Sequence, residues 1–214
     1  MGLHAFDPGR FGARRGGGEH PRLLTLTVAV PPITDVVSLT EAKEWLRVDG
    51  NDQDATISAL ITAATEWAEG YTRRAFIDRE LDVTFAYFPF VGLDFYLPLP
   101  NVTALTSLTW VDGAGTDQVY DIADLDVEPT FGLLRVKGDA AQDWPQDAHS
   151  VNALYTGGFG VDASDIPENV KTAIKIAIAQ MFEMRMDQTF GAQASVPQTK
   201  SSMMLLQHFR VWDL

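Results

Sequence analysis

Residues 38–75, SLTEAKEWLRVDGNDQDATISALITAATEWAEGYTRRA, decide the fold because they predict a capped short helix, a polar loop and a longer amphipathic helix. Ser38 and Glu41 have the spacing of a capping box, in which each side chain satisfies a backbone N–H group that the first helical turn leaves unpaired. We therefore expect the first helix to begin at this point.

The second helix has an apolar and a polar side. Its apolar residues recur with the 3.6-residue period of a buried helix face. They are Ile57, Leu60, Ile61, Ala64, Trp67, Ala68 and Tyr71. Most of the residues on the other side are polar: Asp54, Ser58, Thr62, Glu66 and Glu69. We expect Asp54 to lie in the first helical turn, with Asn51 or Asp52 as the cap.

Residues 79–156 change to a period of two, which is typical of strands. The alternating segments are 81–88, 94–99, 102–111, 118–122, 125–129, 132–137 and 151–156. Residues 110–117 predict a hairpin turn, because glycine adopts positive φ without strain. Short strands with no helices between them predict an antiparallel sheet or a small sandwich flanked by helices, which is an α+β fold.

A further helix is expected after Asp165, the candidate cap. Pro167 would lie near the first helical position, Glu168 in the first turn and Arg185 in the last turn, where each charge suits the helix dipole. Its apolar stripe should pack against the helix that contains Trp67. The stripe consists of Val170, Ala173, Ile174, Ala177, Ile178, Met181 and Phe182.

Three segments together resemble a known family. They are residues 39–76, residues 155–185 (YTGGFGVDASDIPENVKTAIKIAIAQMFEMR) and residues 197–211 (PQTKSSMMLLQHFRV). In this order, with a strand-rich insert, they resemble the head-tail connector, or adaptor, proteins of long-tailed bacteriophages and gene transfer agents. The family's fold would be a small helical bundle, two N-terminal helices plus a later helix, with an antiparallel β-rich insert and an extended C-terminal tail helix.

The resemblance also implies a role. It implies a virion structural protein and not an enzyme, in a ring of twelve copies under the portal, which joins the DNA-filled head to the tail while DNA passes through the centre. Its partners would be the portal protein, a tail-side stopper or tail completion protein, and other copies of itself. It would be located at the head-tail interface of the virion, after assembly in the bacterial host cytoplasm.

The chain divides into three parts on composition and pattern. Residues 1–22 are a Gly- and Arg-rich leader, expected to be flexible or to become ordered against a neighbouring subunit. Residues 23–190 would form the adaptor domain, with helices in 38–76 and 166–186 and the β-rich insert in 79–156. Within it, residues 23–30 predict a strand that Pro31 and Pro32 end, at a sheet edge of its own subunit or the next.

Residues 191–214 would be a linker and a C-terminal portal-docking segment. Apolar residues surround more than one face of this tail, so it must be buried, either on its own core or on a partner. The resemblance favours the portal as that partner. The portal-binding candidates are Met203, Met204, Leu205, Leu206, Phe209, Arg210, Val211, Trp212 and Leu214. Arg73 and Arg74 are candidates for contact with an acidic neighbouring subunit.

Composition limits the possible functions. The 214 residues, of which 46% are hydrophobic, are enough for one packed domain with appendages. The absence of cysteine excludes disulfides, thiolate metal sites and cysteine nucleophiles, and suits a reducing compartment. No apolar run approaches the roughly 18 residues of a membrane span, and the N-terminus lacks the apolar core of a signal peptide, so we expect a soluble protein with no membrane partner.

The net charge of −13 argues against binding to nucleic acid through phosphates. Residues 1–22 carry a balance of +2, which leaves −15 on the remainder. An acidic surface can serve solubility, or it can line a ring through which DNA slides without binding, because like charges repel.

Catalytic patterns are weak throughout. The four histidines, His4, His20, His149 and His208, lie far apart, so we expect no metal site. The loop from Asp49 lacks the glycine and the glutamate of a calcium loop. The acidic residues Asp121, Asp124, Asp126 and Glu128 are interpreted as surface loops.

Two rival functions remain open at this stage. YTGGFG lacks the lysine of a phosphate loop and predicts a tight turn, and no nucleophile triad can be nominated, so we expect no catalytic residue and no cofactor. One rival is an acidic metal-dependent hydrolase or nuclease of phage origin. The other is a generic protein-binding module, in which the tail closes the fold.

Overall fold

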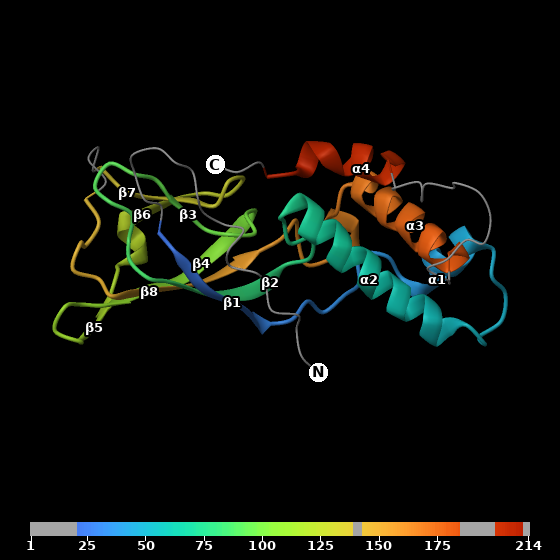
Figure 1. Cartoon of the computed structure of the whole chain (residues 1–214), viewed down its shortest axis with the longest axis horizontal. Coiled ribbons are helices and arrows are strands. Elements are labelled where there is room, and N and C mark those ends of the chain that lie inside the picture. The colour runs from blue at the N-terminus through green and yellow to red at the C-terminus, as the bar shows by residue number, and fades with distance from the viewer. Residues whose placement is uncertain (1–20, 139–142, 185–199, 212–214) are drawn as a thin grey trace, which may run out of the picture. The chain divides into compact units, whose positions relative to one another are not determined.

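The computed structural model describes residues 21–138, 143–184 and 200–211, which fall into two compact units. The β unit comprises the described residues up to Pro31 together with residues 78–158, and the helical unit comprises residues 32–77 together with the described residues from 159 to 211. Figure 1 shows the strands of the first and the helices of the second. The predicted α+β class is confirmed.

The helical unit contains four α-helices among its described residues. They are α1 (Leu39–Leu46), α2 (Asp54–Thr72), α3 (Glu168–Glu183) and α4 (Lys200–Leu206), with short 3-10 turns at Ala163–Asp165 and Gln207–Phe209. The predicted capping box is confirmed at the start of α1. The Glu41 N–H group donates to Ser38 Oγ at 3.2 Å, and the Ser38 N–H group donates to Glu41 Oε2 at 3.0 Å. This exchange satisfies two backbone groups that the helix itself leaves unpaired.

The predicted cap of α2 is wrong. Gln53 occupies the N-cap position and makes no side-chain capping bond. The side-chain oxygen of Asn51 instead accepts a hydrogen bond from Lys43 Nζ at 3.2 Å. Asp54 does lie in the first turn, as predicted, and forms a 2.7 Å ion pair with Lys43.

The predicted cap of α3 is also wrong. Asp165 ends the preceding 3-10 turn, where its carboxylate accepts a hydrogen bond from the Asp162 N–H group at 3.1 Å. Pro167 holds the N-cap position instead, and Glu168 lies in the first turn as expected. A proline disfavours helical geometry in the residue before it, and Ile166 is accordingly extended, so α3 cannot begin earlier. Arg185 lies outside the described residues.

The β unit contains two antiparallel sheets. The larger has the strand order β1-β2-β8-β4-β5 and the smaller has the order β3-β7-β6. The bounds are β1 (Leu23–Val30), β2 (Arg79–Phe85), β3 (Phe95–Tyr96), β4 (Val102–Val111), β5 (Asp117–Val119), β6 (Leu125–Glu128), β7 (Leu133–Val136) and β8 (Ser150–Gly157). Each of the alternating segments of the sequence overlaps one of these strands. The predicted hairpin joins β4 to β5, with Gly115 at φ +80°.

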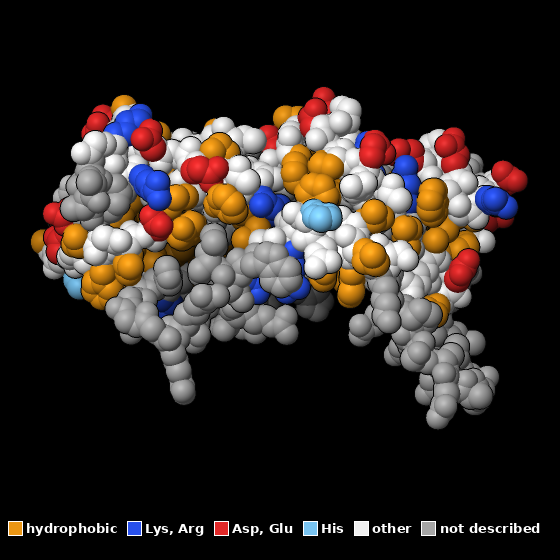
Figure 2. Space-filling view, turned by 90° about the horizontal axis from the view of Figure 1, so that it is seen from above, with side chains coloured by type: hydrophobic (Ala, Val, Ile, Leu, Met, Phe, Trp, Pro, Cys, Tyr) orange, Lys and Arg blue, Asp and Glu red, His pale blue; other side chains and the backbone are white. Residues whose placement is uncertain are grey.

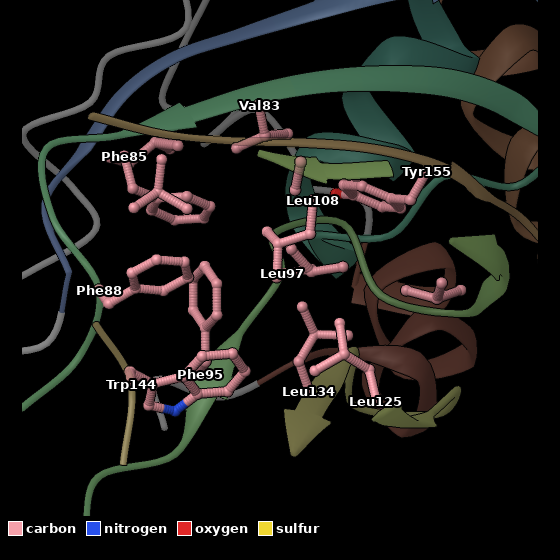
Figure 3. Close-up of a cluster of buried hydrophobic side chains, with 14 of the residues drawn as sticks. Val83, Phe85, Phe88, Phe95, Leu97, Leu108, Leu125, Leu134, Trp144 and Tyr155 are labelled. Atoms are coloured by element: carbon pink, nitrogen blue, oxygen red, sulfur yellow. The ribbon is translucent and has the colours of Figure 1, made fainter. Parts of the chain in front are cut away.

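Each unit has its own hydrophobic core. The core of the β unit is rich in aromatic side chains, and Figure 3 shows Phe88, Phe95 and Trp144 in close contact. The ring centroids of Phe88 and Trp144 are 5.2 Å apart in a stacked arrangement. In the helical unit, α2 and α3 pack against each other as predicted, and their buried residues belong to one core.

Candidate functional site: the C-terminal helix and its contact surface

The C-terminal helix α4 packs on α3 and on α2 of the same chain (Figure 1). Ser202 and Leu206 are completely buried, and Leu205 and Phe209 pack against the core of the helical unit. A helix of seven residues is too short to be stable alone in water, so this packing is what stabilises it. Part of the tail therefore closes the core of its own unit.

Two hydrogen bonds hold the end of the tail. The Val211 N–H group donates to the carbonyl oxygen of Thr72 at 2.9 Å, at the end of α2. Arg74 Nε donates to the carbonyl oxygen of Phe209 at 2.7 Å. Each bond satisfies a backbone carbonyl at a helix end, where the helix supplies no partner of its own.

Aromatic contacts complete this arrangement. The ring of Phe209 meets that of Phe159 edge to face, with centroids 6.0 Å apart. The Arg210 guanidinium lies over the Tyr71 ring, 5.1 Å from its centroid, which is the geometry of a cation–π interaction. We call Tyr71, Thr72, Arg74 and Phe159, together with α3, the α4 contact surface.

The opposite side of the tail is open. Met204 is 70% exposed and His208 is exposed, while Met203 and Val211 are half-buried. Figure 2 looks onto the side of the molecule on which α4 lies and shows apolar side chains next to a histidine. The structure thus divides the portal-binding candidates into inward residues, such as Leu206, and outward ones, such as Met204. Trp212 and Leu214 lie outside the described residues.

The two arginines after α2 have different environments. Arg73 ends the helix in the left-handed region, at φ +56°, and its side chain is half-buried. Arg74 is only 8% exposed, and its Nε atom bonds to the tail 135 residues away. The sequence offered no signal for this bond, because the acceptor is a backbone carbonyl. Arg74 is thus a positioning residue for the tail in this structure, and any role between subunits stays a prediction.

The acidic residues of the β unit support local structure. The Asp121 carboxylate accepts a hydrogen bond from the Ala123 N–H group at 2.9 Å. That of Glu128 accepts from the N–H groups of Thr130 and Phe131 at 3.2 and 2.9 Å. Among residues 21–138, 143–184 and 200–211, no three His, Asp or Glu side chains are grouped so that they could hold a metal ion.

Glycine is required within YTGGFG for close packing, and the tight turn stays a prediction. A Cβ atom on Gly158 would lie 2.4 Å from the backbone nitrogen of Asp78, which is closer than van der Waals contact allows.

Within the described helices, none combines the length and the hydropathy needed to cross a bilayer.

Comparison with known protein families gives a match that includes residues 39–76, the first of the three segments that resemble head-tail connectors. The sequence profile of the Phage gp6-like head-tail connector protein family matches residues 36–90. The resemblance to head-tail connectors is therefore confirmed. This connector segment runs from just before α1 to a point after β2.

The fold is similar to that of three solved chains, each 23% identical in sequence. They come from structures described as "Neck of empty GTA particle computed with C6 symmetry", "Virion of native gene transfer agent (GTA) particle" and "Neck of native GTA particle computed with C12 symmetry". The TM-scores are 0.71, 0.70 and 0.64, and each alignment covers 89% of this chain and 97% of the other. A comparison with curated protein sequences finds no match.

Proposed function

We propose that this protein is a virion structural protein, a head-tail connector that forms a ring under the portal. The ring joins the DNA-filled capsid to the tail and lets DNA pass through its lumen. The observation that carries the proposal is the similarity of fold to chains of a particle neck, over 89% of this chain and 97% of theirs. The match of residues 36–90 to the connector family supports it independently of the fold.

The proposed partners follow from this position in the particle. They are the portal protein on the head side, a stopper or tail completion protein on the tail side, and further copies of this chain. One of the similar structures is a neck with C12 symmetry, which supports a ring of twelve copies here. The protein would assemble in the bacterial host cytoplasm and remain in the virion.

The acidic charge fits a channel that DNA crosses without binding. A net charge of −13 offers few cations to replace the counterions of the phosphates, so DNA gains little by adsorbing. The proposed role is structural and needs neither a cofactor nor a metal ion.

In this proposal residues 23–190 form the adaptor domain, a small helical bundle that carries the antiparallel β-rich insert. Residues 1–22 precede it as a leader, and residues 191–214 supply the linker and the extended C-terminal docking helix. The outward residues Met203, Met204 and Val211 would contact the portal, continued by Trp212 and Leu214. Leu205, Leu206 and Phe209 would support this surface from the inner side, with Arg210 beside them.

The contact between adjacent subunits would include the cations that follow α2. Of Arg73 and Arg74, Arg73 has the more accessible side chain and is the better candidate for an acidic neighbour. Arg74 would support the same interface indirectly, because it fixes the end of the tail through Phe209.

Co-sedimentation with purified portal rings from the same genome tests the proposal. Deletion of residues 198–214 would remove the buried Leu206, so the sharper variant is Met204→Asp, which changes a side chain that is 70% exposed. Val91→Asp is the matched control, since Val91 is 53% exposed and belongs to the β unit. We expect the wild type and the control to bind, and Met204→Asp to bind at least about tenfold more weakly, because a buried unpaired charge is costly in an apolar interface.

The outcomes separate function from site. If the wild type does not sediment with portal rings, the connector function is wrong. If Met204→Asp binds as well as the control, the connector function stands and the docking site lies elsewhere on the chain.

A further inference from the structure

The five-stranded sheet of the β unit has two open edges. Strand β1 forms one edge, with β2 on its inner side. At the other edge, β5 pairs only with Thr109–Val111 of β4, so residues 103–107 of β4 have no neighbouring strand on that side among the described residues. Local hydrogen bonds limit this second stretch, from Val102 N–H to the Pro129 carbonyl and from Tyr120 N–H to the Leu108 carbonyl.

Both edge strands are free of charge. Neither LLTLTVAV (β1) nor VTALTSLTWV (β4) contains Asp, Glu, Lys, Arg or Pro, although charged residues make up 21% of the chain. Soluble proteins usually protect a sheet edge with charges, proline or a covering segment, because an open edge is a template for another strand. Register shifts, which can also blunt an edge, interrupt both strands, at Leu23/Thr25 and Val28/Val30 of β1 and at Val102/Ala104 and Leu105/Ser107 of β4, but neither strand carries a charge or a proline that would keep a second strand away.

The exposed side chains agree with this interpretation. On β1, Leu24 is 42% and Val30 is 51% exposed, and Thr25 and Thr27 are exposed between them. On β4, residues 103, 104 and 106 are exposed, and all are threonine or alanine. Threonine and valine, which are β-branched, pack well across paired strands, whereas alanine contributes little.

The topology determines how two copies can join. Strands β1, β2, β8 and β4 are each antiparallel to the next, so β1 and β4 run in opposite directions at the two edges. A rotation about a ring axis therefore brings β1 of one copy antiparallel to β4 of the next. The two stretches are similar in length: β1 keeps a regular register with β2 over Thr25–Val28, and the open part of β4 spans residues 103–107, with a register shift against β8 between Leu105 and Ser107.

We propose that β1 of each copy pairs antiparallel with residues 103–107 of β4 in the adjacent copy, so that the sheet continues from subunit to subunit. This contact is heterologous and repeats around a closed ring without leaving an edge. This pairing rests on the proposed ring, in which neighbouring copies of this chain occupy both edges of the sheet. The register shifts on either side of Thr25–Val28 add the local twist that a curved sheet needs.

Engineered cysteines test the pairing directly, because the chain has none of its own. Thr27 and Ser107 lie in one row of the sheet, through Asp82 and Leu154, so a sheet that continues between copies without a shift along the strands would bring them face to face. On portal rings, oxidised Thr27→Cys/Ser107→Cys should give a ladder of covalent oligomers on a non-reducing gel. Thr25→Cys/Ser107→Cys covers a register shifted by two residues, and the single variants are the controls.

Charge variants test the same contact and depend less on the register of the two strands, because the long side chains of Lys and Glu can also reach diagonal neighbours. Thr27→Lys/Ser107→Lys should weaken ring formation about tenfold, since like charges across a strand pair repel, and Thr27→Lys/Ser107→Glu should restore it. The readout is the number of copies per portal ring by native mass spectrometry, with circular dichroism to confirm that each variant is folded.

The results distinguish this inference from the function on which it rests. Failure of the wild type to bind portal rings overturns both. Full binding by all charge variants, with no covalent ladder in either cysteine pair, overturns the edge pairing and leaves the connector function intact. Covalent dimers of the single variant Thr27→Cys would indicate that β1 pairs with β1 of another copy. Protection of the β1 amides from hydrogen exchange in the monomer would indicate that residues 1–20 cover this edge. Either result overturns the proposal.

Discussion

The β unit and the helical unit bury their apolar surface in different ways. The β unit relies on a few large rings, and Trp144 alone contacts Phe88, Phe95 and Tyr120. The helical unit relies on many small side chains, with buried alanines at positions 42, 64, 68, 173 and 177 between aliphatic ones. Small residues let helices approach closely, whereas large rings fill the space between two sheets.

The two units also differ in how far the chain itself covers their surface. The helical unit covers part of its core with the C-terminal segment of the chain, through Leu206 and Phe209. The β unit leaves two uncharged strand edges open among the described residues. The chain thus covers part of the helical core by itself, whereas the two edges of the β unit are the surface that we propose a second copy covers.

Removal of Trp144 should have the largest effect, and it tests whether the two cores are independent. Trp144 is 1% exposed, and the change Trp144→Ala should destabilise the β unit by roughly 3 to 5 kcal/mol through lost burial and a cavity. Because the helical unit has its own core, α2 and α3 should keep their protection in hydrogen exchange measured by mass spectrometry. Equal loss of protection in both units would show that they unfold as one.

Leu206→Ala is the corresponding test of the helical unit. Leu206 is fully buried, so we expect a loss of about 2 to 4 kcal/mol in urea unfolding followed by circular dichroism at 222 nm. Met204→Ala is the control two residues away, and it should change stability by less than about 0.5 kcal/mol because its side chain is 70% exposed. Equal effects of the two variants would mean that α4 contributes nothing to the core.

The sequence predicted these elements well wherever one-sided burial sets the pattern. Alternation located the strands, since most of them have one face toward a core, and the 3.6-residue period located α2 and α3. The starts of α2 and α3 were less predictable than that of α1, because several polar residues near each start compete for the cap position. Lys43 binds the side chain that was expected to cap α2, and Pro167 keeps Ile166 out of α3.

The candidate site could be predicted only in part. The apolar tail stood out, but apolar residues on several faces do not tell which of them point inward, and the assignment of Leu206 to the core needed coordinates. The hydrogen bond from Arg74 to Phe209 joins groups 135 residues apart. Its acceptor is a backbone carbonyl, which every residue has, so no sequence pattern could indicate this bond. The uncharged strands were visible in the sequence, whereas their places at the two edges depend on topology.

The capping box of α1 should contribute less than either core residue, and it makes the helical unit sensitive to pH. Ser38→Ala should cost about 1 kcal/mol, the usual value of a lost cap. The hydrogen bond from the Ser38 backbone holds the pKa of Glu41 below its ordinary value of 4.5, and Lys175 adds to this effect. The resulting stabilisation is fully present above the pKa of Glu41 in the unfolded chain and is lost as the pH falls through the lower pKa of the folded protein.

Urea unfolding at several pH values measures this dependence. The stability difference between the wild type and Glu41→Gln should shrink as the pH falls below about 4.5, the titration range of a free glutamate. Glu44→Gln is the matched control, because it removes a carboxylate of the same helix that lies outside the capping box. A difference that stays constant down to the acid limit would exclude the cap as the source.

Magnesium should have the smallest effect, and it tests the rival function in both units at once. A true metal site stabilises the folded state in proportion to its occupancy, so a hydrolase that uses a carboxylate cluster would gain several degrees in Tm in excess Mg²⁺. In the β unit, Asp121 and Glu128 already accept hydrogen bonds from backbone N–H groups of their own turns. We therefore expect a change in Tm below about 1 °C at millimolar Mg²⁺, with an equal ionic strength of NaCl as the control. A larger, saturable rise with Mg²⁺ that Asp124→Asn or Asp126→Asn abolishes would favour the metal-dependent enzyme, and it would assign to the β unit a chemical role that the helical unit lacks.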